Sequence, residues 1–126
     1  MSNVINWFEI PVTNFQRASE FYGKVLGGPV VPFEQPEGGP TKNYGFLPGS
    51  EAGGVGGALV EGDGFEPTQT GQIVFLNGGD DLAAPLARVE EAGGKVLNPK
   101  MSIGENGFIA HFLDTEGNRV ALHSMS

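Results

Sequence analysis

Hydrophobic and polar side chains alternate most regularly near the end of the chain. Residues 108–113 read Phe-Ile-Ala-His-Phe-Leu, and residues 119–123 read Arg-Val-Ala-Leu-His. Side chains on a strand alternate between its two faces, so both runs predict strands. Between them, residues 114–118 supply turn formers, including a glycine that is free to take a positive φ. The pattern predicts a β-hairpin that carries both histidines of the protein, His111 and His123.

The first half of the chain opens with a similar alternation. Residues 6–12 predict a strand with Trp7 and Glu9 on one face. Asn14 is expected to cap a helix whose apolar residues recur at helical spacing until glycines 27–28 end it. Three short strands bounded by Gly or Pro are predicted next, over residues 30–34, 43–47 and 55–61.

The second half repeats this order. A strand is predicted over residues 72–76, then a helix capped by Asp80 or Asp81 and stopped by glycines 93–94. A short strand at 95–97, a loop at 99–106 and the hairpin complete the set. We therefore predict an α+β fold of two βαβββ modules, with curved mixed sheets around a cleft and a helix on the outer face of each sheet. The modules, 1–61 and 71–126, would be joined by a linker at 62–70 and form one domain.

Composition narrows the function classes. A chain of 126 residues suits one domain and buries enough surface to fold without disulfides. The absence of cysteine excludes thiol catalysis and Cys-ligated zinc. A net charge of −8 argues against nucleic acid or an anionic membrane as partner. Neither a leader-like segment nor a membrane-spanning apolar run is present, so we expect a soluble, cytoplasmic protein.

Several short segments, taken in this order, resemble one known family. They are Asn-Phe-Gln-Arg-Ala-Ser-Glu-Phe-Tyr at 14–22, Leu-Gly at 26–27, Gly-Gln-Ile-Val-Phe-Leu at 71–76, Glu-Ala-Gly-Gly-Lys at 91–95 and Asp-Thr-Glu-Gly-Asn at 114–118. This arrangement resembles the vicinal oxygen chelate superfamily, which includes glyoxalase I, fosfomycin-resistance enzymes, bleomycin-binding proteins and extradiol dioxygenases. The resemblance implies paired modules that enclose a cleft for a small molecule, and commonly a homodimer.

The resemblance also locates four positions where metal-dependent members carry ligands. They correspond to Trp7, Ala58 (with Gly56 as the neighbouring possibility), Gln72 and Ala121. Trp and Ala offer no ligand atom, and Gln is at best a weak oxygen ligand. We therefore expect the usual metal site to be dismantled and predict no cofactor.

Two hypotheses for function follow. The preferred one is a metal-free small-molecule-binding protein of the bleomycin-resistance kind, which holds a partly aromatic or amide-bearing ligand on Trp7 and Gln72. Trp7 should offer a stacking surface, whereas the other strand aromatics are expected in the core: Phe46, Phe75 and Phe108. The remaining residues expected to line the cleft are Glu9, His111, Ala121 and His123.

The alternative is an enzyme. Glu9 could act as a general base, with Trp7 shielding its carboxylate from water. His111 is the second catalytic candidate, because its aligned position in fosfomycin-resistance proteins lies near the bound substrate. Glu9, His111 and His123 would then serve a lyase, isomerase or dioxygenase-like reaction, with or without a relocated Fe, Mn, Ni or Zn ion.

Overall fold

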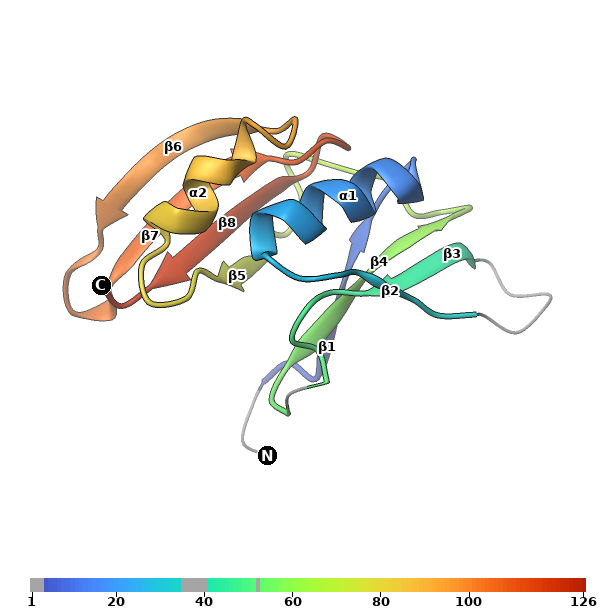
Figure 1. Cartoon of the computed structure of the whole chain (residues 1–126), viewed down its shortest axis with the longest axis horizontal. Helices are drawn as coiled ribbons and strands as arrows, with labels where there is room; N and C mark the ends of the chain where they lie inside the picture. The colour runs from blue at the N-terminus through green and yellow to red at the C-terminus, as the bar shows by residue number, and fades with distance from the viewer. Residues whose placement is uncertain (1–3, 35–40, 52) are drawn as a thin grey trace.

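The computed structural model describes residues 4–34, 41–51 and 53–126, which form two four-stranded sheets and two helices (Figure 1). Sheet A contains, in spatial order, β1 (Trp7–Pro11), β4 (Gly56–Gly62), β3 (Thr41–Phe46) and β2 (Val31–Pro32). Sheet B contains β5 (Phe75–Asn77), β8 (Arg119–Ser124), β7 (Phe108–Leu113) and β6 (Lys95–Ser102). In each sheet the first and last strands of the module pair in parallel and the other pairs are antiparallel. The predicted fold of two βαβββ modules is therefore confirmed, while the module boundaries at 61 and 71 stay a prediction.

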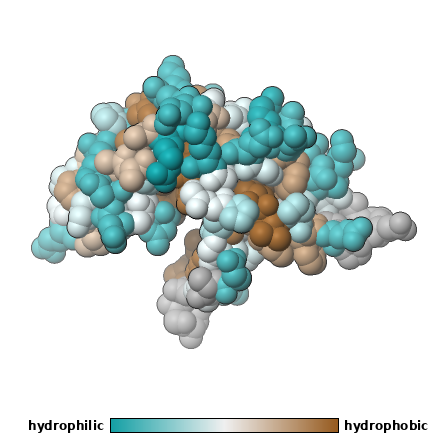
Figure 2. All heavy atoms as spheres, in the orientation of Figure 1, coloured by the Kyte–Doolittle hydropathy of each residue, from teal (hydrophilic) through white to brown (hydrophobic). Residues whose placement is uncertain are grey.

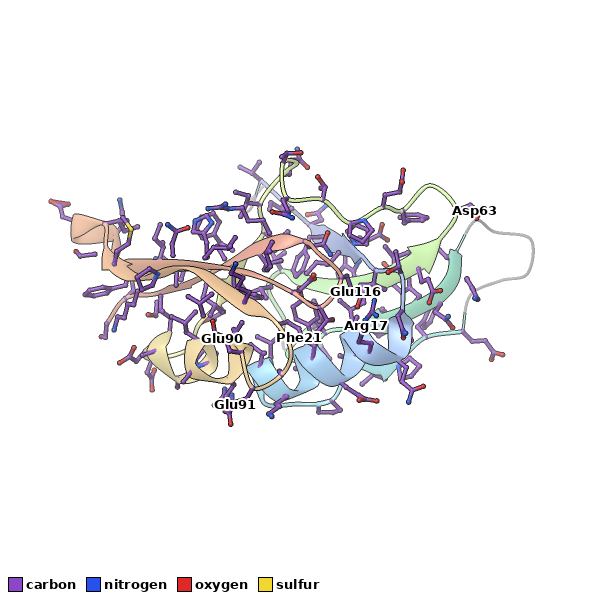
Figure 3. The ribbon with its side chains drawn as sticks, turned by 90° about the horizontal axis from the view of Figure 1, so that it is seen from above. Arg17, Phe21, Asp63, Glu90, Glu91 and Glu116 are labelled. Carbon is purple, nitrogen blue, oxygen red and sulfur yellow. The ribbon has the colours of Figure 1, made fainter. Side chains whose placement is uncertain are left out.

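Both helices, α1 (Phe15–Leu26) and α2 (Ala83–Val89), pack on one side of the sheets and contact each other (Figures 1 and 3). The core lies between the helices and the sheets. It draws on both modules, with these buried residues: Ile10, Val12, Ala18, Phe21, Tyr22, Val25, Leu47, Leu59, Leu76, Leu82, Val89, Ala110, Phe112, Val120 and Leu122. Neither helix is long and apolar enough to cross a membrane within the part of the chain that the structure describes.

Helix α1 forms as its sequence predicts. The Asn14 side chain accepts a hydrogen bond from the Arg17 N–H, which satisfies one of the free donors of the first turn. At the other end Gly27 adopts a left-handed conformation with φ of 77°, where a side chain would be strained. Four residues of α1 are buried in the core: Ala18, Phe21, Tyr22 and Val25.

The start of α2 differs from the prediction. Leu82, and not Asp80 or Asp81, occupies the N-cap position, and its side chain is fully buried in the core. Asp81 instead accepts a hydrogen bond from the Ala83 N–H, one residue outside the cap. Burial of Leu82 therefore decides where the helix begins, and Pro85 is tolerated because it lies in the first turn.

Two strands of sheet B also differ from the prediction. Strand β5 covers 75–77 and not 72–76, because the Arg119 N–H that could extend the ladder donates to the Thr68 carbonyl instead. Strand β6 continues to Ser102, through residues expected to form a loop. It tolerates Pro99 because it is an edge strand with irregular pairing on either side of Asn98.

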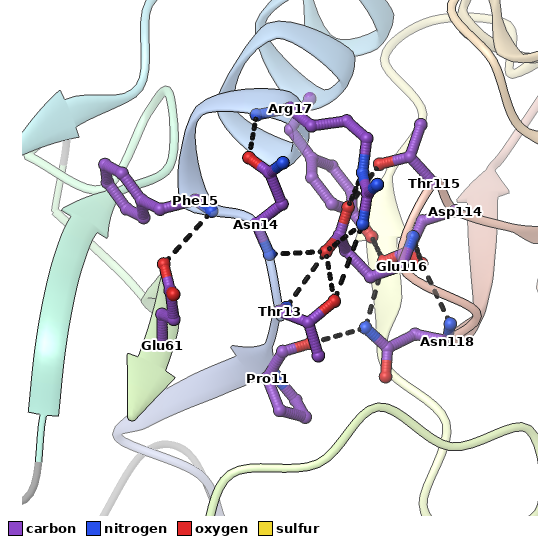
Figure 4. Close-up of polar contacts among 11 residues, drawn as sticks. Pro11, Thr13, Asn14, Phe15, Arg17, Glu61, Asp114, Thr115, Glu116 and Asn118 are labelled. Carbon is purple, nitrogen blue, oxygen red and sulfur yellow. Dashed lines mark hydrogen bonds and ion pairs between the residues drawn. The ribbon is translucent and has the colours of Figure 1, made fainter. Parts of the chain in front are cut away.

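The turn at 114–118 joins the two modules (Figure 4). Glu116 lies at the start of α1, where its Oε1 accepts hydrogen bonds from the backbone N–H groups of Thr13 (2.9 Å) and Asn14 (2.8 Å). Arg17 also donates to the same carboxylate, with its Nε 2.7 Å from Oε2. The Glu116 side chain is inaccessible to solvent. A carboxylate from the second module thus satisfies the free donors at the first helix.

A second set of contacts in the same turn is buried. Tyr22 Oη donates to Asp114 Oδ2 at 2.7 Å, and Asn118 Nδ2 donates to the Pro11 carbonyl at 2.7 Å. Asp114 also accepts hydrogen bonds from the backbone N–H groups of Glu116 and Asn118. Buried polar groups are stable only when they are paired in this way. The turn therefore fixes α1 and the end of β1 against sheet B.

The hydrogen bonds to Glu116 predict how stability depends on pH. Burial alone would raise the pKa of Glu116, but hydrogen bonds from Arg17, Thr13, Asn14 and Thr115 lower it from 4.5 to about 2. A depressed carboxyl pKa stabilises the fold above pH 4.5, and this stabilisation is lost as pH falls toward 2. With allowance for solvent screening it amounts to about 1–3 kcal/mol.

We expect Glu116→Gln to lower the free energy of unfolding at pH 7 by that amount and to flatten its fall between pH 4.5 and 2. Urea denaturation at several pH values measures both effects. Glu20→Gln, on the exposed face of α1, is the matched control and should change stability by less than about 0.5 kcal/mol. Equal stability of the Glu116 and Glu20 variants would contradict the role given to this carboxylate.

Candidate ligand-binding cleft

The faces of the sheets that point away from the helices are the concave faces, and two equivalent rows of residues cross them. In sheet A, Glu9 pairs with Ala58, which pairs with Phe46. In sheet B, the row runs from Phe75 through Ala121 to His111. Ile10, the residue after Glu9 in β1, is buried in the core. Because side chains alternate along a strand, Trp7 and Glu9 lie on the opposite, concave face.

A cleft of about 1580 Å³ opens between the two modules. Trp7 and Glu9 line it from β1, and Gln72, Ile73 and Phe75 line it from the opposite module. Figure 2 shows the surface hollowed on the side away from the helices, between the body of sheet B and the projecting part formed by β1 and β4. The structure therefore brings together three of the residues that the sequence nominated for ligand binding.

The apolar walls of this cleft are accessible. The Trp7 side chain is 38% exposed and that of Phe75 is 50% exposed. The expectation that Phe75 lies in the core is wrong, because β5 turns this residue to the concave face and Leu76 to the core. Phe46 and Phe108 are partly buried. Phe75 thus adds an aromatic surface opposite Trp7 that sequence reasoning missed.

Glu9 is held by a neighbour that sequence reasoning also missed. Tyr44 Oη donates to Glu9 Oε2 at 2.7 Å and accepts a hydrogen bond from Trp7 Nε1 at 2.9 Å. Burial, together with the hydrogen bond to Glu9, raises the pKa of Tyr44, so the phenol stays protonated as a donor. Glu9 itself is exposed, so the expected shielding by Trp7 is not found. The sequence predicts a strand at 43–47, but only the strand order β1-β4-β3 shows that Tyr44 can reach Glu9 across β4.

His111 contacts a different set of residues on sheet B. Its Nδ1 accepts a hydrogen bond from Arg119 Nε at 3.1 Å, which assigns the ring proton to Nε2. Arg119 also donates to Asn98 Oδ1, and Phe75 packs edge-on against the imidazole. Burial and the nearby Arg119 charge lower the pKa of His111 below 6.5. The imidazole is therefore a neutral hydrogen-bond donor at neutral pH.

The remaining residues nominated on sheet B lie outside the cleft that contains Trp7. Ala121 is fully buried between β5 and β7. His123 Nε2 lies 2.7 Å from the Asn106 carbonyl and lines a second cavity of about 930 Å³. Strand β5 lies between the two cavities, because Phe75, Leu76 and Asn77 line both of them.

The donor set does not fit the metal that the family resemblance implies. Of the four positions, Trp7 and the two alanines carry no ligand atom, and Gln72 alone offers an amide oxygen. Within residues 4–34, 41–51 and 53–126, no group of three His, Asp or Glu side chains is placed to hold a metal ion. Glu9, His111 and His123 therefore do not form the relocated set within one chain.

The fold and the cleft define an α+β protein of paired modules, and the comparisons with known proteins identify its family. Residues 4–122 match the model of the Glyoxalase/Bleomycin resistance protein/Dioxygenase superfamily. The chain belongs to this superfamily, as its motifs predicted. No curated protein is matched by its sequence.

Solved structures share the fold at low sequence identity. A glyoxalase/bleomycin resistance protein from Albidiferax ferrireducens T118 superposes with a TM-score of 0.76 at 14% identity, over 98% of this chain and 100% of that one. One from Streptomyces sp. CB03234 gives 0.67 at 25% identity, over 95% and 100%. A fosfomycin resistance protein from Listeria monocytogenes gives 0.63 at 13% identity, over 100% and 94%.

The contact between Arg119 and His111 predicts a measurable shift. Arg119→Gln removes the nearby cation, so the pKa of His111 should rise toward 6.5, while burial still keeps it lower. In the native protein the depressed pKa favours the fold above pH 6.5, and this advantage is lost as pH falls through the folded pKa.

NMR titration of the His111 ring protons measures the change, with assignment by the His123→Gln spectrum. Lys42→Gln is the matched control, since Lys42 is an exposed cation on sheet A and pairs with Glu61. An unchanged His111 titration in Arg119→Gln would contradict the electrostatic coupling.

Proposed function

We propose that this protein binds a small organic molecule in the cleft between its modules, without a catalytic metal. The observation that carries the proposal is that Trp7, Glu9 and Gln72 line one accessible cleft. Trp7 offers an apolar ring for stacking, and the Gln72 amide offers a hydrogen-bond donor and an acceptor. A partly aromatic or amide-bearing ligand suits this combination.

The lining of the cleft supports the proposal. Small-molecule sites commonly measure roughly 300–1,000 Å³ and combine apolar walls with a few polar groups. This cleft is larger, about 1580 Å³, and is apolar at Trp7, Ile73 and Phe75. The names of the similar structures, which refer to bleomycin and fosfomycin resistance, are also consistent with small-molecule ligands.

The proposal predicts ligand binding that does not depend on metal. Trp7 is the single tryptophan, so its fluorescence reports directly on the cleft. A library of aromatic amides should contain compounds that change this emission equally with and without EDTA. Gln72→Ala should weaken them by about threefold to tenfold, as expected for the loss of one hydrogen bond. Compounds that stabilise the fold without perturbing Trp7 would argue against this site.

The enzyme alternative gives a different result in a parallel measurement. If Mn²⁺, Fe²⁺, Ni²⁺ or Zn²⁺ binds the folded chain, the melting temperature must rise. We expect no such rise and no stoichiometric metal by elemental analysis. Stoichiometric metal that is lost in His111→Ala and His123→Ala would contradict the proposal. It would favour a lyase, isomerase or dioxygenase-like enzyme in which Glu9 also acts.

We also propose that the protein is a homodimer. Large apolar side chains outside the cleft remain exposed in the single chain, among them Met101 (50%), Ile103 (38%) and Met125 (64%). Exposed apolar surface of this kind is typical of interaction sites. Light scattering should give twice the 13.2 kDa of one chain at micromolar concentration. A mass of one chain over the whole accessible concentration range would contradict the dimer.

A further inference from the structure

Four aromatic rings meet on the concave face of sheet A. Phe46 lies at their centre, with its ring centroid 5.7 Å from that of Trp7, 5.2 Å from Phe33 and 6.1 Å from Tyr44. Trp7 and Phe33 are 38% and 47% exposed, so part of the cluster remains accessible to a ligand. It adjoins the cleft, because Trp7 is part of both.

One carboxylate lies within this aromatic cluster. The polar atoms of Tyr44 and Trp7 are both engaged in the hydrogen-bonded chain that ends at Glu9 Oε2. Glu9 is exposed, and no Lys or Arg of the described residues forms an ion pair with it. The nearest cation along β3, Lys42, is paired with Glu61 instead. The surface therefore offers π faces and an uncompensated negative charge.

Both features favour the same kind of ligand group. An aromatic ring has a negative face and attracts a cation, as does a carboxylate. An anion would be repelled, and a neutral group would gain only from apolar contact. The net charge of −8 adds to the attraction of a cation.

The equivalent position on sheet B has the opposite character. There His111 replaces Phe46 in the row, and it is held by Arg119. Glu9 lines the cleft but His111 and Arg119 do not, so the Arg119 cation lies outside the surface that Glu9 and Trp7 form.

We propose that Glu9 and the cluster of Trp7, Phe33, Tyr44 and Phe46 form a subsite for an organic cation, a protonated amine or quaternary ammonium group with an apolar body. This subsite rests on the proposed small-molecule function and names its ligand class. Glu9 binds the positive charge, and the exposed rings contact the apolar groups around it.

The test uses three probes that share one benzyl group and differ in charge. Benzyltrimethylammonium, benzyl alcohol and phenylacetate are titrated against the native protein at constant ionic strength, with Trp7 fluorescence as the signal. We expect the cation to bind at least about fivefold more tightly than the alcohol, and the anion to bind most weakly. The preference should decrease as salt is raised.

Two variants assign the preference to the subsite. Glu9→Gln keeps the shape but removes the charge, so the ratio between cation and alcohol should fall below about twofold. Phe33→Leu should weaken the cation by about twofold to fivefold and retain the order of the probes. Glu91→Gln, beside helix α2 in Figure 3, removes the same charge from another surface and should change nothing.

Several results would overturn the subsite, and they have different consequences for the proposed function. If cation and alcohol bind alike, or if Glu9→Gln retains the preference, the cation class is wrong while small-molecule binding in the cleft stands. If no probe changes Trp7 emission but aromatic amides do, the cluster is not a cation site and the cleft remains. If the amides also have no effect, both proposals fail.

Discussion

The structure depends on the hydrogen bonds that the turn at 114–118 makes to the first module. Within the described residues, no strand of one sheet pairs with a strand of the other, so the backbone ladders do not set the relation between the sheets. Glu116, Asp114 and Asn118 instead reach α1, Tyr22 and the end of β1. Because these groups are buried and mutually satisfied, removing one leaves another unpaired, which is costly.

This attachment explains why the cleft has its composition. Strand β1 is connected to α1 by Thr13 and Asn14, whose backbone N–H groups donate to Glu116. With this end of β1 fixed, Trp7 and Glu9 face the opposite module across the cleft. The segment that leads into β5 and the start of that strand, with Gln72 and Phe75, form the facing wall. Of the four positions where the family resemblance implies metal ligands, Trp7 and Gln72 line this cleft, and they contribute an aromatic ring and an amide in place of a donor set.

Much of the fold could be predicted from the sequence, because alternation and capping are local. Asn14, Gly27 and the hairpin turn were placed correctly for this reason. The bounds of β5, β6 and α2 could not, since they depend on tertiary competition: Arg119 bonding to Thr68, irregular pairing around Asn98, and burial of Leu82. For the site, alternation put Trp7 and Glu9 on one face of a strand, and the family resemblance assigned that face to the cleft. Tyr44 and Arg119 became visible only through strand neighbours that sequence spacing does not encode.

We propose above all that the cleft binds a small molecule without a metal. The most direct measurement is a ¹H–¹⁵N NMR titration of the isotope-labelled protein with aromatic amides in the presence of EDTA. We expect the resonances of the Trp7 indole N–H, the Gln72 side-chain amide and the Phe75 backbone amide to shift together as ligand is added. Shifts that are absent, that lie away from these three residues, or that require added Zn²⁺ would contradict it.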